Sequence, residues 1–190
     1  MKLINILLEA KVIKYTKPNF ATEWEEANRY PEFQDMGKEK WIEVANQGKP
    51  IAFSKIKDTL GNVDLDFDGL EEPKKERFKQ AFEKGVIEMS IVVKFGEGDY
   101  DLVAGNTRLS GLVRNGVDPQ LWVVDISHLM EMLMEGIDDP VKPGILKKRL
   151  GTLSCSKVRA EKSKLEDKGT HFAKALQRYL NYHCKWKHQN

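Results

Sequence analysis

The fold is decided by the stretch IEMSIVVKFGEGDYDLVAGNTRLSGLVRNGVDPQLWVVDI (87–126), in which strand-like and helix-like sequence patterns follow one another. The β-branched run 87–95 predicts a strand, and a glycine-containing turn leads from it into a second short strand at 100–104. Residues 106–116 place apolar side chains at helical spacing and predict a helix. The apolar run 121–126 predicts a further strand.

The segment before this stretch adds a strand and a helix. IAFSKI (51–56) predicts a strand, and 73–84 predicts a helix that ends at Gly85, the residue type that most often closes a helix. The resulting order is strand, helix, strand, strand, helix, strand. This order predicts an α/β (α+β) fold with a small mixed sheet.

The two ends of the chain differ from this central part. Residues 1–50 predict a helical N-terminal extension, with one helix at about 38–47. Residues 51–141 form the predicted α/β domain, and residues 142–190 form a basic C-terminal region with predicted helices at about 154–165 and from about residue 170 onward.

Charge is distributed unevenly along the chain. The 190 residues carry 31 Lys and Arg against 29 Asp and Glu, a net charge of +2, but residues 142–190 contain 13 basic and 3 acidic residues. Such a basic region suits contacts with a phosphate backbone, so DNA is the expected partner. The candidate DNA-binding residues are Lys147, Lys148, Arg149, Lys157, Arg159, Lys174 and Arg178. Two alternatives remain: the basic region docks on the acidic body of its own fold, or it is a protein-binding arm.

Several classes of protein are excluded at this stage. No apolar run approaches the length that a membrane span requires, so no membrane partner is expected. Cys155 and Cys184 do not make a disulfide framework, which favours a reducing, cytoplasmic location. His183, Cys184 and His188 lack a second ligand pair at zinc spacing, and no structural zinc is expected.

The turn AGNTR (104–108) is a candidate anion site. Gly105 allows the backbone to turn tightly, and Asn106 or Thr107 can cap the helix that follows. The first N–H groups of a helix point outward without partners and attract anions, and Arg108 adds a guanidinium that can contact a phosphate. The alternative is that the turn merely caps itself and that Arg108 pairs with a nearby carboxylate.

Four features together resemble the N-terminal domain of the ParB/sulfiredoxin superfamily over about residues 51–126. They are the strand IAFSKI, the helix and apolar step FEKGVIEMSIVV, the hairpin into YDLVAGNTRL, and the helix ending at Gly116 before LWVVDI. The resemblance implies the fold of that superfamily and phosphate binding at Gly105, Asn106, Thr107 and Arg108.

The resemblance also locates a departure from the family pattern. Asn106 stands where sulfiredoxins have the catalytic cysteine and where partition proteins have a glutamate. Sulfiredoxin activity is therefore not expected. Asn106 can still hydrogen-bond a phosphate or a water, so Asn106 and Arg108 are the candidate catalytic residues.

The acidic loop DLDFDG (64–69) is the candidate metal site, through Asp64, Asp66 and Asp68. Its opening matches a calcium loop, but Lys75 replaces the closing glutamate. One alternative is a polar loop that caps the next helix; another is a loop that faces Gly105 and helps to hold Mg²⁺ with a bound phosphate.

The function expected from these features is a ParB-like nuclease or nucleotide phosphohydrolase that binds CTP or ATP with Mg²⁺ and contacts DNA. Metal-assisted attack by water would be the mechanism. The alternatives are a non-catalytic, partition-type DNA-binding adaptor and a small-molecule kinase acting on a small phosphate acceptor. A homodimer is compatible with each of the three.

Overall fold

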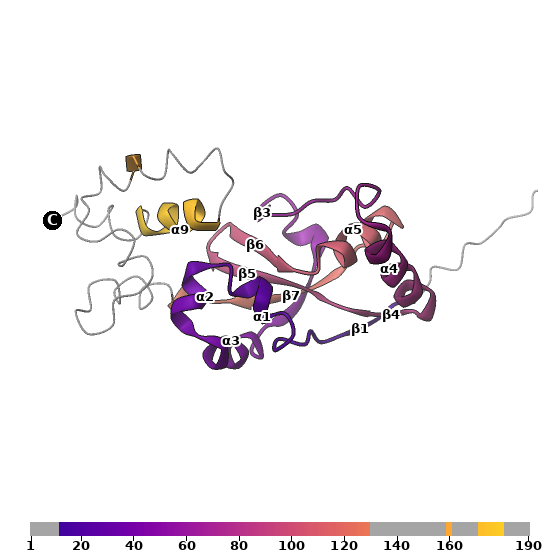
Figure 1. Cartoon of the computed structure of the whole chain (residues 1–190), viewed down its shortest axis with the longest axis horizontal. Helices are drawn as coiled ribbons and strands as arrows, with labels where there is room; N and C mark the ends of the chain where they lie inside the picture. The colour runs from indigo at the N-terminus through magenta and orange to yellow at the C-terminus, as the bar shows by residue number, and fades with distance from the viewer. Residues whose placement is uncertain (1–11, 130–158, 161–170, 181–190) are drawn as a thin grey trace, which may run out of the picture.

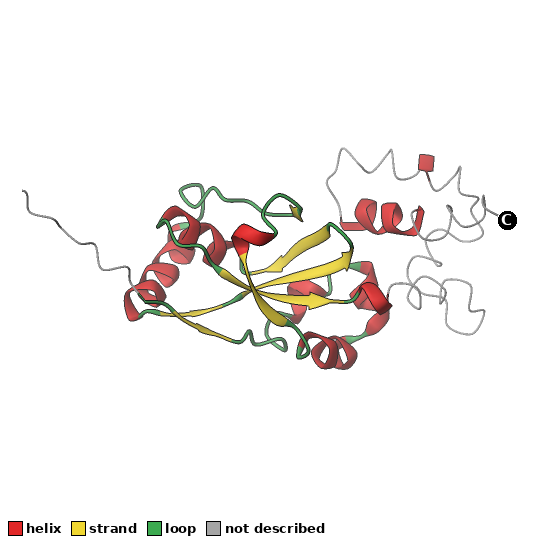
Figure 2. Cartoon of the chain, turned by 180° about the vertical axis from the view of Figure 1, so that it is seen from behind, coloured by secondary structure: helices red, strands yellow, loops and turns green. Residues whose placement is uncertain are grey.

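The computed structural model describes residues 12–129, 159–160 and 171–180. A five-stranded sheet forms the centre of the molecule (Figures 1 and 2), in the order β2-β7-β5-β6-β3. Its strands are β2 (Lys49–Ala52), β3 (Leu60–Gly61), β5 (Ser90–Gly96), β6 (Asp99–Ala104) and β7 (Gln120–Asp125). β2–β7 and β5–β6 are antiparallel, whereas β5–β7 and β3–β6 are parallel. The mixed sheet with its helices confirms the expected α/β fold.

The central strand β5 is buried on both faces, which explains its nearly continuous apolar sequence. Ile91, Val93 and Phe95 belong to the core on one face of the sheet, and Val92 belongs to the core on the other. The alternation follows from the two-residue period of a strand.

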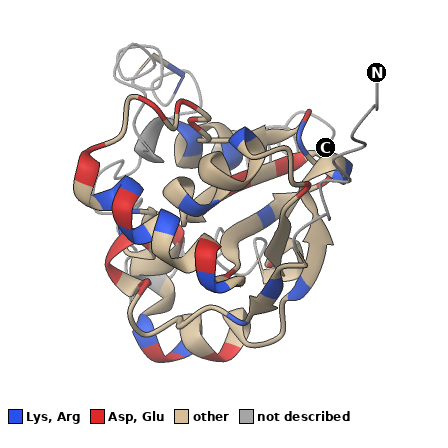
Figure 3. Ribbon diagram, turned by 90° about the vertical axis from the view of Figure 1, so that its right-hand side faces the viewer, with Lys and Arg blue, Asp and Glu red and all other residues tan. Residues whose placement is uncertain are grey.

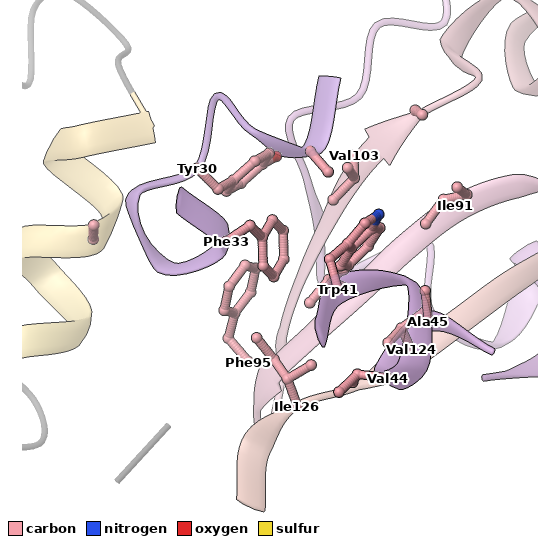
Figure 4. Packing of buried hydrophobic residues seen from close by; sticks show 14 of the residues in the cluster. Tyr30, Phe33, Trp41, Val44, Ala45, Ile91, Phe95, Val103, Val124 and Ile126 are labelled. Carbon is pink, nitrogen blue, oxygen red and sulfur yellow. The ribbon is translucent and has the colours of Figure 1, made fainter. Parts of the chain in front are cut away.

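Helices from both ends of the chain cover the first face. They are α1 (Trp24–Ala27), α2 (Pro31–Met36), α3 (Lys38–Ala45) and α9 (His171–Tyr179). Tyr30, Phe33 and Trp41 pack together with Phe95 of β5 (Figure 4), and all four rings are almost fully buried. Burying each such ring stabilises the fold by about 2–3 kcal/mol. Residues 20–45 therefore share one core with the sheet.

The second face is covered by the 3₁₀ turn η1 (Phe53–Lys55) and by α5 (Asn106–Arg114). α4 (Glu72–Lys84) packs closely against α5, where a Cβ on Gly111 would lie 2.6 Å from the ring of Phe78. Beside α4, β1 (Lys14–Thr16) and β4 (Val86–Glu88) form a separate parallel pair. These elements surround the N-terminus of α5.

Most elements expected from the sequence are confirmed, with differences at three places. The expected strand 87–95 is split at Met89, because Ile87 pairs with Tyr15 of β1 while the following residues join the main sheet. The expected strand 51–56 is β2 followed by a 3₁₀ turn. Residues 1–50 are not purely helical, since they include β1. The helix expected at 154–165 lies outside the described residues, apart from helical residues 159–160.

A proline opens the second helix of the N-terminal extension. A proline commonly stops a helix, but it is also favoured in the first helical turn, where its missing N–H costs nothing. Pro31 occupies that position and begins α2. Gly85 meets the expectation fully: it closes α4 in the left-handed conformation, with φ +69°.

Candidate functional site

A cleft of about 920 Å³ opens at the N-terminus of α5. Its floor is the end of β6 and the GNTR turn (105–108). One wall is α4, and the other is formed by α1 with β1 and β4. The charged side chains that line it are Glu23, Glu26, Lys74, Arg77, Glu88 and Arg108.

The turn at Gly105 is specific for glycine. Its φ is +90°, and a Cβ there would lie 2.7 Å from both Nη2 of Arg108 and Oγ of Ser90. Ser90 donates its hydroxyl hydrogen bond to the Gly105 carbonyl at 2.8 Å. The first intrahelical bond runs from the Leu109 N–H to the same carbonyl, and no side chain caps the helix. The N–H groups of residues 106–108 therefore precede the helical ladder and lie at the cleft floor.

Arg108 is held by two carboxylates. Its Nη2 lies 2.7 Å from Oε1 of Glu23, its Nη1 lies 2.8 Å from Oε2 of Glu88, and its side chain is only 20% exposed. The alternative of pairing with a nearby carboxylate is thus what the structure shows. A ligand phosphate would have to displace these carboxylates to contact Nη1 and Nη2 of Arg108. In the structure Arg108 acts as a clamp at the floor of the cleft, and its contact with a phosphate stays a prediction.

Asn106 connects the turn to the acidic loop. The main-chain N–H of Asp64 donates to Oδ1 of Asn106 at 3.0 Å. The acidic loop therefore reaches the GNTR turn, which is the position needed by the alternative of a loop that faces Gly105. The side chain of Asn106 serves as a loop anchor through that oxygen, and the amide nitrogen of its side chain remains for a ligand.

The three loop aspartates are not brought together as metal ligands. Asp64 and Asp66 accept main-chain hydrogen bonds from the N–H groups of Asp66 and Gly69, and Asp68 pairs with Arg114. Within residues 12–129, 159–160 and 171–180, no group of three His, Cys, Asp or Glu side chains is arranged to hold a metal ion. The loop uses its carboxylates to stabilise its own turns and to contact α5.

Lys74 and Arg77 on α4 are cleft residues that the sequence analysis missed. Lys74 makes a loose ion pair with Glu71 at 3.4 Å, and Arg77 donates Nε to the Pro73 carbonyl at 3.3 Å. An arginine has five N–H donors, so most of those on Arg77 remain for a ligand. Their i,i+3 spacing was the only sequence signal that they lie on one side of α4. The same spacing is common on helix surfaces that face solvent, so it did not indicate a binding site.

The cleft carries both signs of charge. The side chains Lys74, Arg77 and Arg108 stand against Glu23, Glu26 and Glu88. Figure 3 views the molecule from the side of α4 and shows acidic and basic positions interspersed along the ribbon. This surface differs from the uniformly basic groove that a nucleic-acid backbone prefers.

The candidate DNA-binding residues are found in three situations. Lys147, Lys148, Arg149 and Lys157 lie outside the described residues, as do the cysteines and His183 and His188. Arg159 is exposed. Lys174 and Arg178 lie on α9, and both contact carboxylates of the α/β fold.

Among the candidates that the structure describes, Arg178 is the most enclosed. Its side chain is 4% exposed, and its donors contact Glu32 at 2.9 Å and Asp99 and Asp101 at 3.1 Å each. Its guanidinium carbon lies 3.4 Å from the ring centroid of Phe95. A side chain so enclosed cannot reach a DNA backbone while α9 is docked. For α9, the structure shows the alternative in which the basic region docks on its own fold.

No family model matches the chain, and no curated protein matches it. Within the described residues, no helix combines the length and apolarity needed to cross a lipid bilayer.

Proposed function

We propose that this protein binds a nucleotide or another phosphate ester in the cleft before the GNTR turn, in a domain of ParB/sulfiredoxin type. The single observation that carries the proposal is the position of the α5 N-terminus at the floor of a 920 Å³ cleft. A cleft of this size accommodates a nucleotide, since ligand pockets commonly measure about 300–1,000 Å³.

The phosphate would lie against the N–H groups of residues 106–108. These groups carry the positive end of the helix dipole. Thr107 contributes a hydroxyl at the cleft lining, and Lys74 and Arg77 supply positive charge from α4. Lys74 acts as a point charge, whereas Arg77 can contact two phosphate oxygens together.

The opposite wall suits the remainder of a nucleotide. Glu26 lines the cleft and forms an ion pair with the exposed side chain of Arg29. Carboxylates accept hydrogen bonds from ribose hydroxyls and from base amino groups. Glu23 and Glu88 are occupied by Arg108 and position the floor of the site.

The test is thermal unfolding with and without CTP, ATP and ADP, each with Mg²⁺. A ligand at about 100 times its dissociation constant adds about 2.7 kcal/mol, which raises the midpoint by roughly 5–10 °C in a chain of this size. Replacing both Lys74 and Arg77 with alanine should abolish the shift. Lys79→Ala is the matched control, because Lys79 lies on α4 in an ion pair with Glu76 and does not line the cleft. No shift with any nucleotide, or an equal shift in the double variant, would overturn the proposal.

A second candidate is the small-molecule kinase, favoured over the nuclease by the mixed charge of the cleft. A nucleotide phosphate would lie at α4 and α5, and a small acceptor with a hydroxyl or amino group would lie near Glu26. Transfer of the ATP γ-phosphate to a free amino acid supports this candidate. Cleavage of plasmid DNA that is lost in the Lys74 and Arg77 double variant supports the nuclease instead.

A further inference from the structure

α9 is held by an arginine socket that lies away from the cleft. The socket consists of Glu32 from α2, Phe95 from β5, and Asp99 and Asp101 from β6, and it encloses the guanidinium of Arg178. The flat face of an arginine stacks favourably on an aromatic ring, and its edge donors match carboxylates. Figure 1 shows α9 beside β6 and α2, at the opposite end of the molecule from α4.

The socket holds more negative than positive charge. Lys174 adds one further contact, with its Nζ 2.6 Å from Oδ1 of Asp101. Three carboxylates therefore face two cations, and Oε2 of Glu32 is buried without a hydrogen-bond partner. Both cations of α9 are engaged with the fold and not with solvent anions.

One edge of the socket is open to solvent. The side chains of Lys174 and Asp99 are 40% and 43% exposed, in contrast to Arg178. An anion can approach α9 from this edge without first unfolding the domain. The apolar side of α9 also contributes to docking, because Ala175, Leu176 and Leu180 are buried in the main core.

We propose that α9 is an exchangeable basic helix, for which the socket carboxylates and a phosphate backbone such as duplex DNA compete. Docking withholds Lys174 and Arg178 from DNA, and DNA binding draws α9 off the sheet. The composition suits such a partner, since residues 142–190, which include α9, contain 13 basic and 3 acidic residues. The α9 socket lies apart from the cleft, so exchange of α9 does not depend on a ligand in the cleft.

The test is hydrogen exchange of the amides of residues 171–180 in the full chain, with and without a short DNA duplex. Added duplex should reduce the protection of α9 while β5 stays protected. Asp101→Asn removes a socket carboxylate and should tighten duplex binding roughly fivefold or more, the lower end of the usual coupling between linked equilibria.

Two further variants make the experiment decisive. Glu43→Gln changes the net charge equally at an exposed α3 position outside the socket. If it tightens duplex binding as much as Asp101→Asn does, the effect is net charge alone and the proposal fails. Asp99→Asn replaces a partly exposed carboxylate and serves if Asp101→Asn does not fold. Unchanged α9 protection at saturating duplex, or no duplex binding even by a variant whose α9 is released, would also overturn the proposal.

Discussion

Arg108 joins Glu88 through a contact of 2.8 Å between Nη1 and Oε2. Because Nη2 of Arg108 contacts Glu23, a single side chain fixes the first turn of α5 to both β4 and the start of α1. Glu88 also accepts a hydrogen bond from the main-chain N–H of Asn19. The floor of the cleft is thus assembled from segments far apart in the sequence.

Arg108→Ala should destabilise the protein by about 1–3 kcal/mol, because it leaves two half-buried carboxylates without their charged partner. Chemical denaturation measures the change. Arg29→Ala is the control, since Arg29 pairs with Glu26 at the surface and its loss should cost about 0.5 kcal/mol or less. Equal effects of the two substitutions would contradict the clamp role.

Gly105→Ala should destabilise the fold by about 1–3 kcal/mol. The cost has two parts: a positive φ, and a Cβ only 2.7 Å from Arg108 and Ser90. Gly98→Ala isolates the first part, because Gly98 has φ +69° and nothing within 4 Å of its added Cβ. The difference in unfolding free energy between the two variants measures the cost of the close Cβ contact. Equal losses of stability would show that Arg108 moves aside freely.

Asn106→Ala should loosen the acidic loop without unfolding α5. The N–H of Asp64 loses its acceptor, so its hydrogen exchange should quicken by roughly five- to tenfold. Asn115→Ala provides the comparison, because Asn115 bonds the Gly111 carbonyl at the other end of the same helix. Unaltered exchange at Asp64 in Asn106→Ala would show that the loop is anchored by other contacts.

The buried carboxyl of Glu32 predicts a pH dependence. Burial raises the pKa of Glu32 above 4.5, although nearby Arg178 acts in the opposite direction. A carboxyl whose pKa is raised on folding contributes stability below its unfolded pKa and loses that contribution as pH rises through the folded value. The unfolding free energy of wild type relative to Glu32→Gln should therefore fall as pH rises above about 4.5. If the unfolding free energies of wild type and Glu32→Gln change with pH in parallel from pH 4 to pH 8, Glu32 titrates as if it were exposed.

The sheet and the GNTR turn could be predicted because their signals are local. β5 and β7 read as apolar runs, and Gly105 followed by the apolar face of α5 marks a strand-to-helix turn. The partners of the charged residues could not be predicted. Glu23 lies 85 positions before Arg108, and no short pattern connects them.

Arg178 shows the same limit more sharply. The helix predicted from about residue 170 onward is confirmed as α9, and its residues Leu176 and Leu180 are buried in the main core. Arginine is seldom fully buried, so a candidate DNA-binding residue such as Arg178 was expected to be exposed. Its burial depends on Glu32, 146 positions earlier in the chain, and on the ring of Phe95. Only the folded arrangement brings these groups together.

The most direct test of the central claim is the amide NMR spectrum during titration with nucleotides and Mg²⁺. If a phosphate binds at the α5 N-terminus, the amides of Asn106, Thr107 and Arg108 should shift most and should saturate together. The same titration of the Lys74 and Arg77 double variant should leave them nearly unmoved. Saturable shifts that bypass these three amides, or no shifts at all, would contradict the claim that the cleft is a phosphate site.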